Sequence, residues 1–487
     1  MGDWEVGGYM LHIIPDTWPH FHMLVSVFPL VGLIFVLGFY ITSVVTNNET
    51  MKWAAMAAIG VLGIIAIPTY VSGDMTLAKV ADDTKRVSAD ISAYHYGWSI
   101  AALAVLVVTG LAALWELWRS RSRGRLSNNM VHLVLGLSFI TLALMIVAGE
   151  TGWESDHPEL HLATRASPGV SASDIPEGIG TPQAWSHFHM ILNHFPTIGF
   201  TVTLAFFIFG LMRDNPVIKR TSLAAFTICG ILGAPTYVTG AAAMWALTDP
   251  PILGVTKAAI NAHRDMALLS LFGLAATGAT AYFELWRYRY LNRFSKTSLN
   301  LVLVLAIITL GIMAETGHRG GLINHPEIRT SPLPTDPNIF WSPNIESLIN
   351  NVIWFVPWQT IHFFGYSLVF GTVLAVVLRV LGFWKSVPFS AVHRLLPIGV
   401  FGVIMNVFTG MLMLMADTYR YVNETSFIPK MFFLPIGASI VLYFSLSDSL
   451  WKVQAGEDAP MTAKWFAVIL LISWIGVIMG GRLLPYV

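Results

Sequence analysis

Residues 53 to 73 read "WAAMAAIGVLGIIAIPTYVSG", a run of 21 residues without a charged side chain. An α-helix rises 1.5 Å per residue, so about 20 apolar residues cross a hydrocarbon core of about 30 Å. Similar runs fill the chain, near residues 22–45, 53–73, 96–118, 130–149, 189–212, 221–246, 264–286, 298–314, 353–383, 395–416, 428–447 and 465–487. They predict an all-α integral membrane protein with about 12 transmembrane helices.

The composition agrees with a membrane protein and limits the cofactors. Of the 487 residues, 55% are hydrophobic and 11% are charged, and the net charge is zero, so no basic domain exists to bind nucleic acid. The single cysteine, Cys229, lies in an apolar run. A c-type haem attachment, an iron–sulfur cluster and an intrachain disulfide are therefore excluded within this chain. A cofactor would have to bind to His, Met or carboxylate side chains.

The basic residues predict the orientation. One set of loops holds 17 of the 28 Lys and Arg residues. Because cytoplasmic loops carry an excess of these residues, we place this Arg-rich side in the cytoplasm of a bacterial inner membrane and both termini in the periplasm. No cleavable signal peptide is visible, and the first apolar run is expected to act as the insertion signal.

Short sequence words occur twice in the chain. "PTYVSG" (68–73) returns as "PTYVTG" (235–240), "HFHM" (20–23) returns at 187–190, "ELWRSR" (116–121) returns as "ELWRYR" (284–289), and "HPEL" (157–160) returns as "HPEI" (325–328). The offset stays at 167 or 168 residues. We therefore predict two parallel four-helix repeats, residues 1–172 and 173–340, followed by a C-terminal four-helix domain, residues 341–487.

The histidines gather at one end of each predicted repeat. In an up-down-up-down bundle the starts of the first and third helices lie on one face of the membrane. This rule brings His22 near His95, and His189 near His263, on the outer side. Imidazoles from two facing helices can be the axial ligands of a haem iron. The sequence thus predicts one or two b-type haems near the periplasmic face.

Each "HFHM" word holds two histidines, His20 with His22 and His187 with His189. Residues two apart on a helix point about 200° apart, so only one of each pair can face the bundle interior. We assign the inward position to His22 and His189, and a surface or hydrogen-bonding position near the headgroups to His20 and His187. The alternative is that histidines at helix ends only anchor the chain at the membrane interface.

One carboxylate lies at the outer end of the fourth helix of each repeat. It is Glu150 in "AGETG" and Glu315 in "MAETG". An ionisable residue inside a membrane is costly and is a functional candidate by default. Glu150 and Glu315 could accept protons beside a redox site. Alternatively, they could complete a two-His, one-carboxylate site for copper, iron or zinc. The pairs His157/Glu159 and His325/Glu327 are expected in solvated outer loops.

Other candidates stand outside the repeated pattern. His194 has Val27 as its counterpart in the first repeat, and His362 enters the first helix of the C-terminal domain without a second histidine nearby in that helix. Both are kept as cofactor-binding candidates. His132 and His393 fall on the Arg-rich side and are expected to contact headgroups. The two "ELWR" words are expected to form a cytoplasmic belt of charged and aromatic residues.

The word "HMILNHFP" (189–196) resembles the His-Pro-x-x-Val-His-Phe-Pro opening of an uncharacterised bacterial four-helix membrane family whose members often accompany c-type cytochrome domains. The resemblance covers residues 19–160 and 186–328. His189 and His194 match both family histidines, whereas the first repeat keeps His22 but has Val27 in the second place. Met23 and Met190 stand where the family has its first proline. Residues from His362 to about Ser445 resemble a second uncharacterised bacterial membrane family.

These observations predict a membrane electron-transfer subunit that exchanges electrons between quinol and a periplasmic c-type cytochrome or another redox subunit. Glu150 or Glu315 would take up protons in such a subunit. Two other interpretations stay open, a mononuclear metal site built from His22, His95 and Glu150, and a non-catalytic membrane anchor for extrinsic cytochromes. Transport ranks below these, because the repeats are parallel and no pair of interrupted helices with buried charge is visible.

Overall fold

The computed structural model describes residues 15, 17–80, 89–156, 182–248, 255–325, 329, 332–336 and 340–484, and the side chains of most of them. All the regular elements of these residues are helices, and 12 helices are long and apolar enough to cross a membrane. The predicted all-α membrane fold is therefore confirmed. The candidate residues His157, Glu159 and Glu327, and the side chain of His187, lie outside the described part of the chain.

The chain divides into two compact units. The first contains Met1–Glu177, His194–Ser222 and Gly320–Pro332, and the second contains Gly178–Asn193, Leu223–Arg319 and Leu333–Val487. The boundary between the units passes through three helices, α7 (Pro182–Met212), α8 (Pro216–Thr248) and α10 (Lys296–Asn324). The division into three predicted domains stays a prediction.

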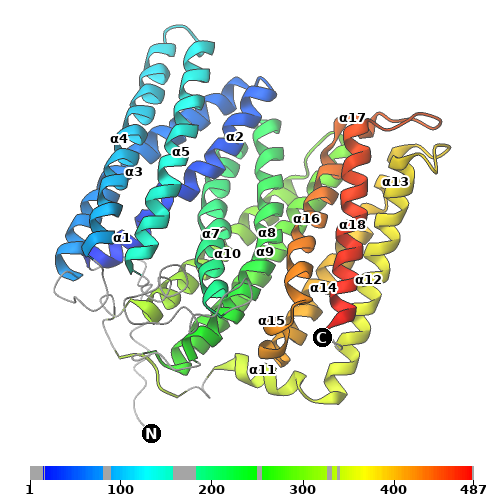
Figure 1. The fold of residues 1–487 in the computed structure, drawn as a ribbon. Helices are drawn as coiled ribbons and strands as arrows, with labels where there is room; N and C mark the ends of the chain where they lie inside the picture. Colours follow the sequence, from blue (N-terminus) through cyan, green and yellow to red (C-terminus); the bar gives the residue numbers. More distant parts are fainter. Residues whose placement is uncertain are drawn as a thin grey trace. The chain divides into compact units, whose positions relative to one another are not determined.

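The first unit contains a closed four-helix bundle, coloured blue to cyan in Figure 1. Its first span consists of α1 (Trp18–Val27), the π-helical turn η1 (Phe28–Gly32) and α2 (Leu33–Val45). The other spans are α3 (Glu49–Val80), α4 (Ala89–Ser120) and α5 (Asn128–Asp156). Helix α3 packs against the first span and against α4, α4 packs against α5, and α5 returns to η1 and α2. Up-down-up-down topology with short connections produces this closure.

Small residues set the distance between α3 and α4. A Cβ atom on Gly63 would lie 3.2 Å from the Cα of Gly110, and the same holds in reverse. Helix backbones in membranes approach closely where small residues meet, because lipid supplies no hydrophobic force between helices. Thr109 on α4 and Thr141 on α5 add a hydroxyl–hydroxyl hydrogen bond of 3.1 Å.

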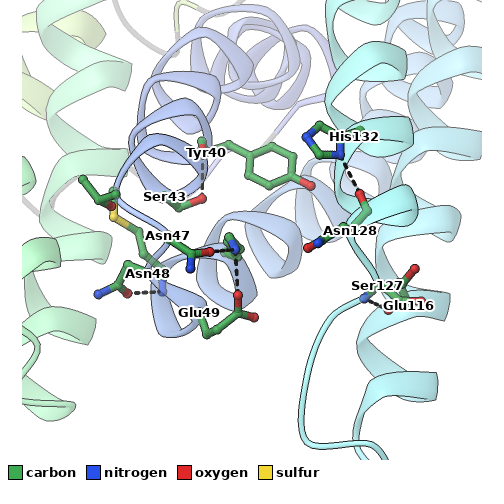
Figure 2. A network of polar contacts seen from close by, with 12 residues as sticks. Tyr40, Ser43, Asn47, Asn48, Glu49, Glu116, Ser127, Asn128 and His132 are labelled. Carbon is green, nitrogen blue, oxygen red and sulfur yellow. Dashed lines mark hydrogen bonds and ion pairs between the residues drawn. The ribbon is translucent and has the colours of Figure 1, made fainter.

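Polar side chains close the Arg-rich end of this bundle, as Figure 2 shows. Between α2 and α3, Lys52 donates to Asn47 Oδ1 at 2.7 Å and pairs with Glu49 at 2.6 Å. Asn47 has a φ of 48°, a left-handed conformation that asparagine tolerates better than most residues. Between α4 and α5, the buried carboxylate of Glu116 accepts from the backbone N–H of Ser127 at 2.6 Å. Glu116, expected in a charged belt, is therefore a buried cap for the following loop.

Two pairs of residues that correspond in the predicted repeats meet within the first unit. The Phe39 ring on α2 stacks on Phe206 of α7, with ring centroids 3.9 Å apart and planes at 18°. The side-chain amides of Asn48 and Asn215, 167 residues apart, exchange hydrogen bonds of 3.5 and 3.3 Å. Contact between a residue and its own counterpart is characteristic of an isologous, two-fold interface.

The second unit contains α9 (Lys257–Leu291) and the C-terminal bundle. That bundle consists of α11 (Trp341–Ile349), α12 (Val352–Leu381), α13 (Phe389–His393), α14 (Leu396–Ala416), α15 (Thr418–Asn423), α16 (Phe427–Leu446), α17 (Asp448–Trp451) and α18 (Met461–Leu483). Helix α12 packs against α14 and α18, and α16 packs against α18, which lie side by side in Figure 1. Trp474, Phe444 and Val376 form part of the apolar core.

Helix α9 fastens the C-terminal bundle through polar contacts at both of its ends. Near its start, Asp265 accepts the backbone N–H groups of Trp341 and Ser342 at 3.0 and 2.9 Å, and so caps α11. Buried Arg264 pairs with Glu346 at 2.9 Å. In the middle and at the far end, Tyr282 bonds to Ser445 at 2.7 Å and Arg289 pairs with Asp448.

Candidate functional site

His22 on α1 is held by the second span of its own bundle. Its Nδ1 lies 3.0 Å from the backbone oxygen of Thr69 and 3.1 Å from the hydroxyl of Ser72. A carbonyl oxygen can only accept, so Nδ1 carries the hydrogen. In the neutral ring, Nε2 then carries the lone pair with which imidazole binds metals.

A proline in the preceding helix explains why the short sequence "PTYVSG" occurs again as "PTYVTG". Pro29 lacks an N–H and cannot donate to the oxygen of Val25, which accepts from the backbone N–H of Phe28 instead. The Thr69 hydroxyl lies 3.4 Å from that oxygen, and η1 widens the turn at the same place. In membranes, Ser and Thr side chains of neighbouring helices commonly supply the donor that a proline removes. "PTYVSG" is thus matched to the proline of the preceding helix.

The glycine that ends each word makes room for the histidine. A Cβ atom on Gly73 would lie 2.9 Å from Cε1 of His22, closer than real Cβ atoms approach. A Cβ atom on Gly240 would lie 2.7 Å from Cε1 of His189. Any larger residue at these two positions would displace the ring.

His189 on α7 repeats the environment of His22. Its Nδ1 lies 3.1 Å from the backbone oxygen of Thr236 and 3.3 Å from the hydroxyl of Thr239. The hydroxyl of Thr236 in turn lies 3.4 Å from the backbone oxygen of Leu192, to which Pro196, four residues later, cannot donate. In both cases 47 residues separate the histidine from the threonine that accepts its hydrogen.

His95 and His263, on the third span of each predicted repeat, are bound to the fourth span in the same way. Nδ1 of His95 lies 2.9 Å from the oxygen of Ala148, and Nδ1 of His263 lies 2.9 Å from the oxygen of Thr316. Each separation is 53 residues. Ser99 places its hydroxyl 3.3 Å from Nε2 of His95. All four imidazoles therefore point Nδ1 at a backbone carbonyl, the arrangement that metal-ligating histidines usually show.

The structure brings His189 and His263 together. Their ring centroids are 6.5 Å apart and their planes make an angle of 73°. An imidazole nitrogen binds a metal at about 2.0–2.1 Å, so two rings on opposite sides of one ion have centres roughly 6 to 6.5 Å apart. The observed spacing suits such a pair.

Because His20 is 5% exposed, the surface position considered for it is wrong.

The two glutamates differ from each other. Glu150 is exposed at the end of α5. Glu315 pairs with Arg319 one turn later at 2.7 Å, and Arg319 also donates to the oxygen of Ala262 at 3.3 Å. An ion pair with Arg319 weighs against Glu315 as a free proton acceptor. No group of three or more His, Cys, Asp or Glu residues that could hold a metal ion occurs in the described part of the chain.

The remaining histidines have separate environments. His194 is half-buried on α7, and His132 is bonded to the oxygen of Asn128 in its own helix at 2.8 Å (Figure 2). The headgroup position expected for His393 is wrong, because this side chain is 1% exposed and bonds to Tyr290 and Ser445. His362 belongs to a cluster of its own, described below.

Sequence reasoning missed the residues that hold the histidines, which are Thr69, Ser72, Gly73, Thr236, Thr239 and Gly240. They stand in the two words "PTYVSG" and "PTYVTG", whose recurrence was the available signal. It also missed Arg319, although its i,i+4 spacing from Glu315 is the spacing of a helical ion pair.

Residues 19–158 match a family described as "Predicted membrane protein (DUF2231)", which corresponds to the first four-helix bundle. No curated protein and no solved structure matches the chain.

Proposed function

We propose that this protein is a membrane electron-transfer subunit with b-type haem held by His22 and His95, and by His189 and His263. The observation that carries the proposal is the shared geometry of these four imidazoles, each with Nδ1 directed at a backbone carbonyl of the next span. The 6.5 Å spacing of the His189 and His263 rings supports it for the second pair.

The donor set of these four histidines fits a haem. Neutral imidazole is a common axial ligand of haem iron, and the chain offers no suitable thiolate, because its single cysteine is buried and remote in sequence from these histidines. Glycines face the rings of His22, His95 and His189 at Gly73, Gly152 and Gly240. A bound haem would supply one-electron transfer.

The protein's own contribution is to orient and tune the ligands. The Nδ1–H···O=C bonds fix the tautomer and the ring plane, and they raise the basicity of Nε2. The hydroxyls of Ser72, Thr151 and Thr239 form a second contact with Nδ1 of three of the rings. All four rings are half-buried in the described structure.

We also propose that residues 1–172 and 173–340 are tandem copies of one unit. The recurring words, the identical separations of 47 and 53 residues, and the contacts Phe39–Phe206 and Asn48–Asn215 support this. Parallel copies would place both haems at one depth near the periplasmic face of a bacterial inner membrane. Such haems would pass electrons along the membrane from quinol to a periplasmic c-type cytochrome.

The test is the absorption spectrum and the haem content of the protein purified from its native membrane. We expect the absorption bands of reduced haem b in the unaltered protein. His189→Ala or His22→Ala should lose about half of the haem, and the double variant should lose all of it. The reason is that loss of a ligand of this kind removes most metal affinity. His132→Ala, an exposed histidine on the Arg-rich end, is the control. A spectrum without b-type bands would refute the proposal. Metal without haem in elemental analysis would favour the mononuclear site. The absence of both haem and metal would favour the non-catalytic anchor.

A further inference from the structure

The C-terminal bundle contains a buried polar cluster that the four histidines do not use. His362 on α12 is 7% exposed, and its Nδ1 lies 2.8 Å from the hydroxyl of Thr409 on α14. The Thr409 hydroxyl also donates to the oxygen of Met405 at 2.7 Å. The side-chain amide of Asn406 on α14 lies beside the same ring, with its nitrogen 3.3 Å from Nδ1 in the orientation that satisfies its hydrogen bonds.

The position of His362 matches that of His22 and His189. All three lie on the first span of a bundle, and each contacts a threonine of the second span that lies 47 residues later. A glycine faces the ring in the third bundle too, because a Cβ atom on Gly410 would lie 3.4 Å from Cε1 of His362. The C-terminal bundle thus places a histidine at the site that corresponds to the first ligand of the two repeats.

The third span of the C-terminal bundle carries a lysine near its start, whereas the third spans of the predicted repeats carry a histidine there. In the repeats, the start of the third span carries His95 or His263, which contacts the fourth span. In the C-terminal bundle, the start of the third span, α16, carries Lys430, which packs against Gly480 and Gly481 of the fourth span, α18. The corresponding site therefore offers an imidazole and an ammonium group in place of two imidazoles.

A phenol completes the cluster. Tyr366 lies one turn after His362, with ring centroids 4.9 Å apart. A Cβ atom on Gly481 would lie 3.2 Å from the Tyr366 hydroxyl and 3.4 Å from the Lys430 ammonium, so both polar groups border one glycine. Among the described residues, no carboxylate forms an ion pair with Lys430. A cation within a membrane span without a counter-charge is costly and marks a functional site.

We propose that His362, Tyr366 and Lys430 bind the head group of a quinone. Lysine and tyrosine donate hydrogen bonds, and a quinone carbonyl is an uncharged acceptor that satisfies them without bringing a second charge into the membrane. Trp358, one turn before His362, and Phe408, beside Thr409, are 5.8 Å apart and supply an aromatic surface for a flat ring. This inference rests on the proposed function in one respect, since it names the site of the quinol substrate.

The experiment measures quinone binding directly, on full-length protein in nanodiscs of neutral phosphatidylcholine. Decylubiquinone is titrated by calorimetry, and its carbonyl stretching band is recorded by infrared difference spectroscopy. We expect saturable binding with a lowered carbonyl frequency. Lys430→Met should weaken binding about tenfold or more and Tyr366→Phe about threefold, the effects of losing a charged and a neutral hydrogen bond. Lys452→Met, at an exposed lysine of the opposite loop, should change nothing.

Several outcomes would overturn the inference. One is an absence of saturable binding by the unaltered protein, and another is equal affinity in Lys430→Met. A third is Lys430-dependent retention of phosphatidylglycerol without quinone binding, which would identify a lipid-headgroup site. Tyr366→Phe keeps the packing of the ring, so it remains informative if Lys430→Met does not fold. Haem content in the same samples separates the two proposals, because quinone binding without haem refutes only the proposed function, and haem without quinone binding refutes only this inference.

Discussion

Helices α4 and α9, the third spans of the two predicted repeats, begin alike and then differ. Each places a histidine against the fourth span at a separation of 53 residues. The next residue is Tyr96 in α4, exposed and 5.6 Å from Tyr70, but Arg264 in α9, buried beside the C-terminal bundle. The second residue after the histidine is Gly97 in α4 and Asp265 in α9, and Asp265 caps α11. His95 and His263 therefore make the same contact with the fourth span. The two residues that follow each histidine differ, and those of α9 contact the C-terminal bundle.

The largest effect is expected where the histidine environments are the same. Gly240→Ala would push a Cβ atom to 2.7 Å from Cε1 of His189 and should remove about half of the haem by displacing that ring. Gly73→Ala should remove a similar share through His22. Gly311→Ala is the control, because a Cβ atom there has nothing within 4 Å. Full haem content in Gly240→Ala, measured by the pyridine haemochrome spectrum, would show that the glycine is not required.

The next effect concerns the outward surface, where the copies differ. Glu346→Gln removes the partner of Arg264, whose side chain is 9% exposed, while that of Glu346 is 42% exposed. We expect a loss of about 1–2 kcal/mol in the free energy of unfolding, below the value for a fully buried pair because one partner is solvated. Tyr96→Phe in the first repeat should change the free energy by less than about 0.5 kcal/mol. Equal effects in the two copies, measured by denaturant titration in mixed micelles, would contradict the comparison.

A smaller loss of stability, equal in the two places, is expected for the threonines that lie beside the two prolines. Thr69→Val and Thr236→Val remove the hydroxyls near the oxygens of Val25 and Leu192 and should each destabilise the protein by about 1 kcal/mol. Thr42→Val is the matched control, because its exposed hydroxyl bonds only within its own helix, to Gly38 at 2.8 Å. If Thr69 and Thr236 behaved like Thr42, the hydroxyls would not be compensating for the prolines.

The smallest effect is expected in the loop between α17 and α18, where the exposed carboxylate of Asp458 pairs with Lys385 and Lys464. Hydrogen bonds from Lys385 and Lys464 hold the pKa of Asp458 below its ordinary value of 3.8. The stabilisation is therefore present above that ordinary value and is lost as the pH falls through the lowered pKa. Asp458→Asn should lower the unfolding temperature at pH 7 by about 1 °C or less, because solvent screens the pair. A difference from the unaltered protein that grew on acidification would refute this assignment.

The spans were predictable because hydropathy and length are local properties of the chain. Helix parity alone was enough to predict that His189 and His263 lie close together. The partners of the histidines were not predictable in this way, because the contact of His22 with Thr69 depends on the rotation of two helices about their axes. The burial of His393 was missed for a related reason. It depends on Tyr290 of α9 packing against a bundle that begins far later in the sequence.

The contacts Phe39–Phe206 and Asn48–Asn215 have a consequence for stoichiometry. Two separate chains meeting through such a two-fold interface would offer identical outer surfaces, so each would recruit its own accessory bundle. In the proposed tandem arrangement the two copies are joined in one polypeptide and can differ, as Arg264 and Asp265 differ from Tyr96 and Gly97. One C-terminal domain then accompanies two proposed copies, so the proposed haem ligand pairs and the proposed quinone site would stand in a ratio of two to one.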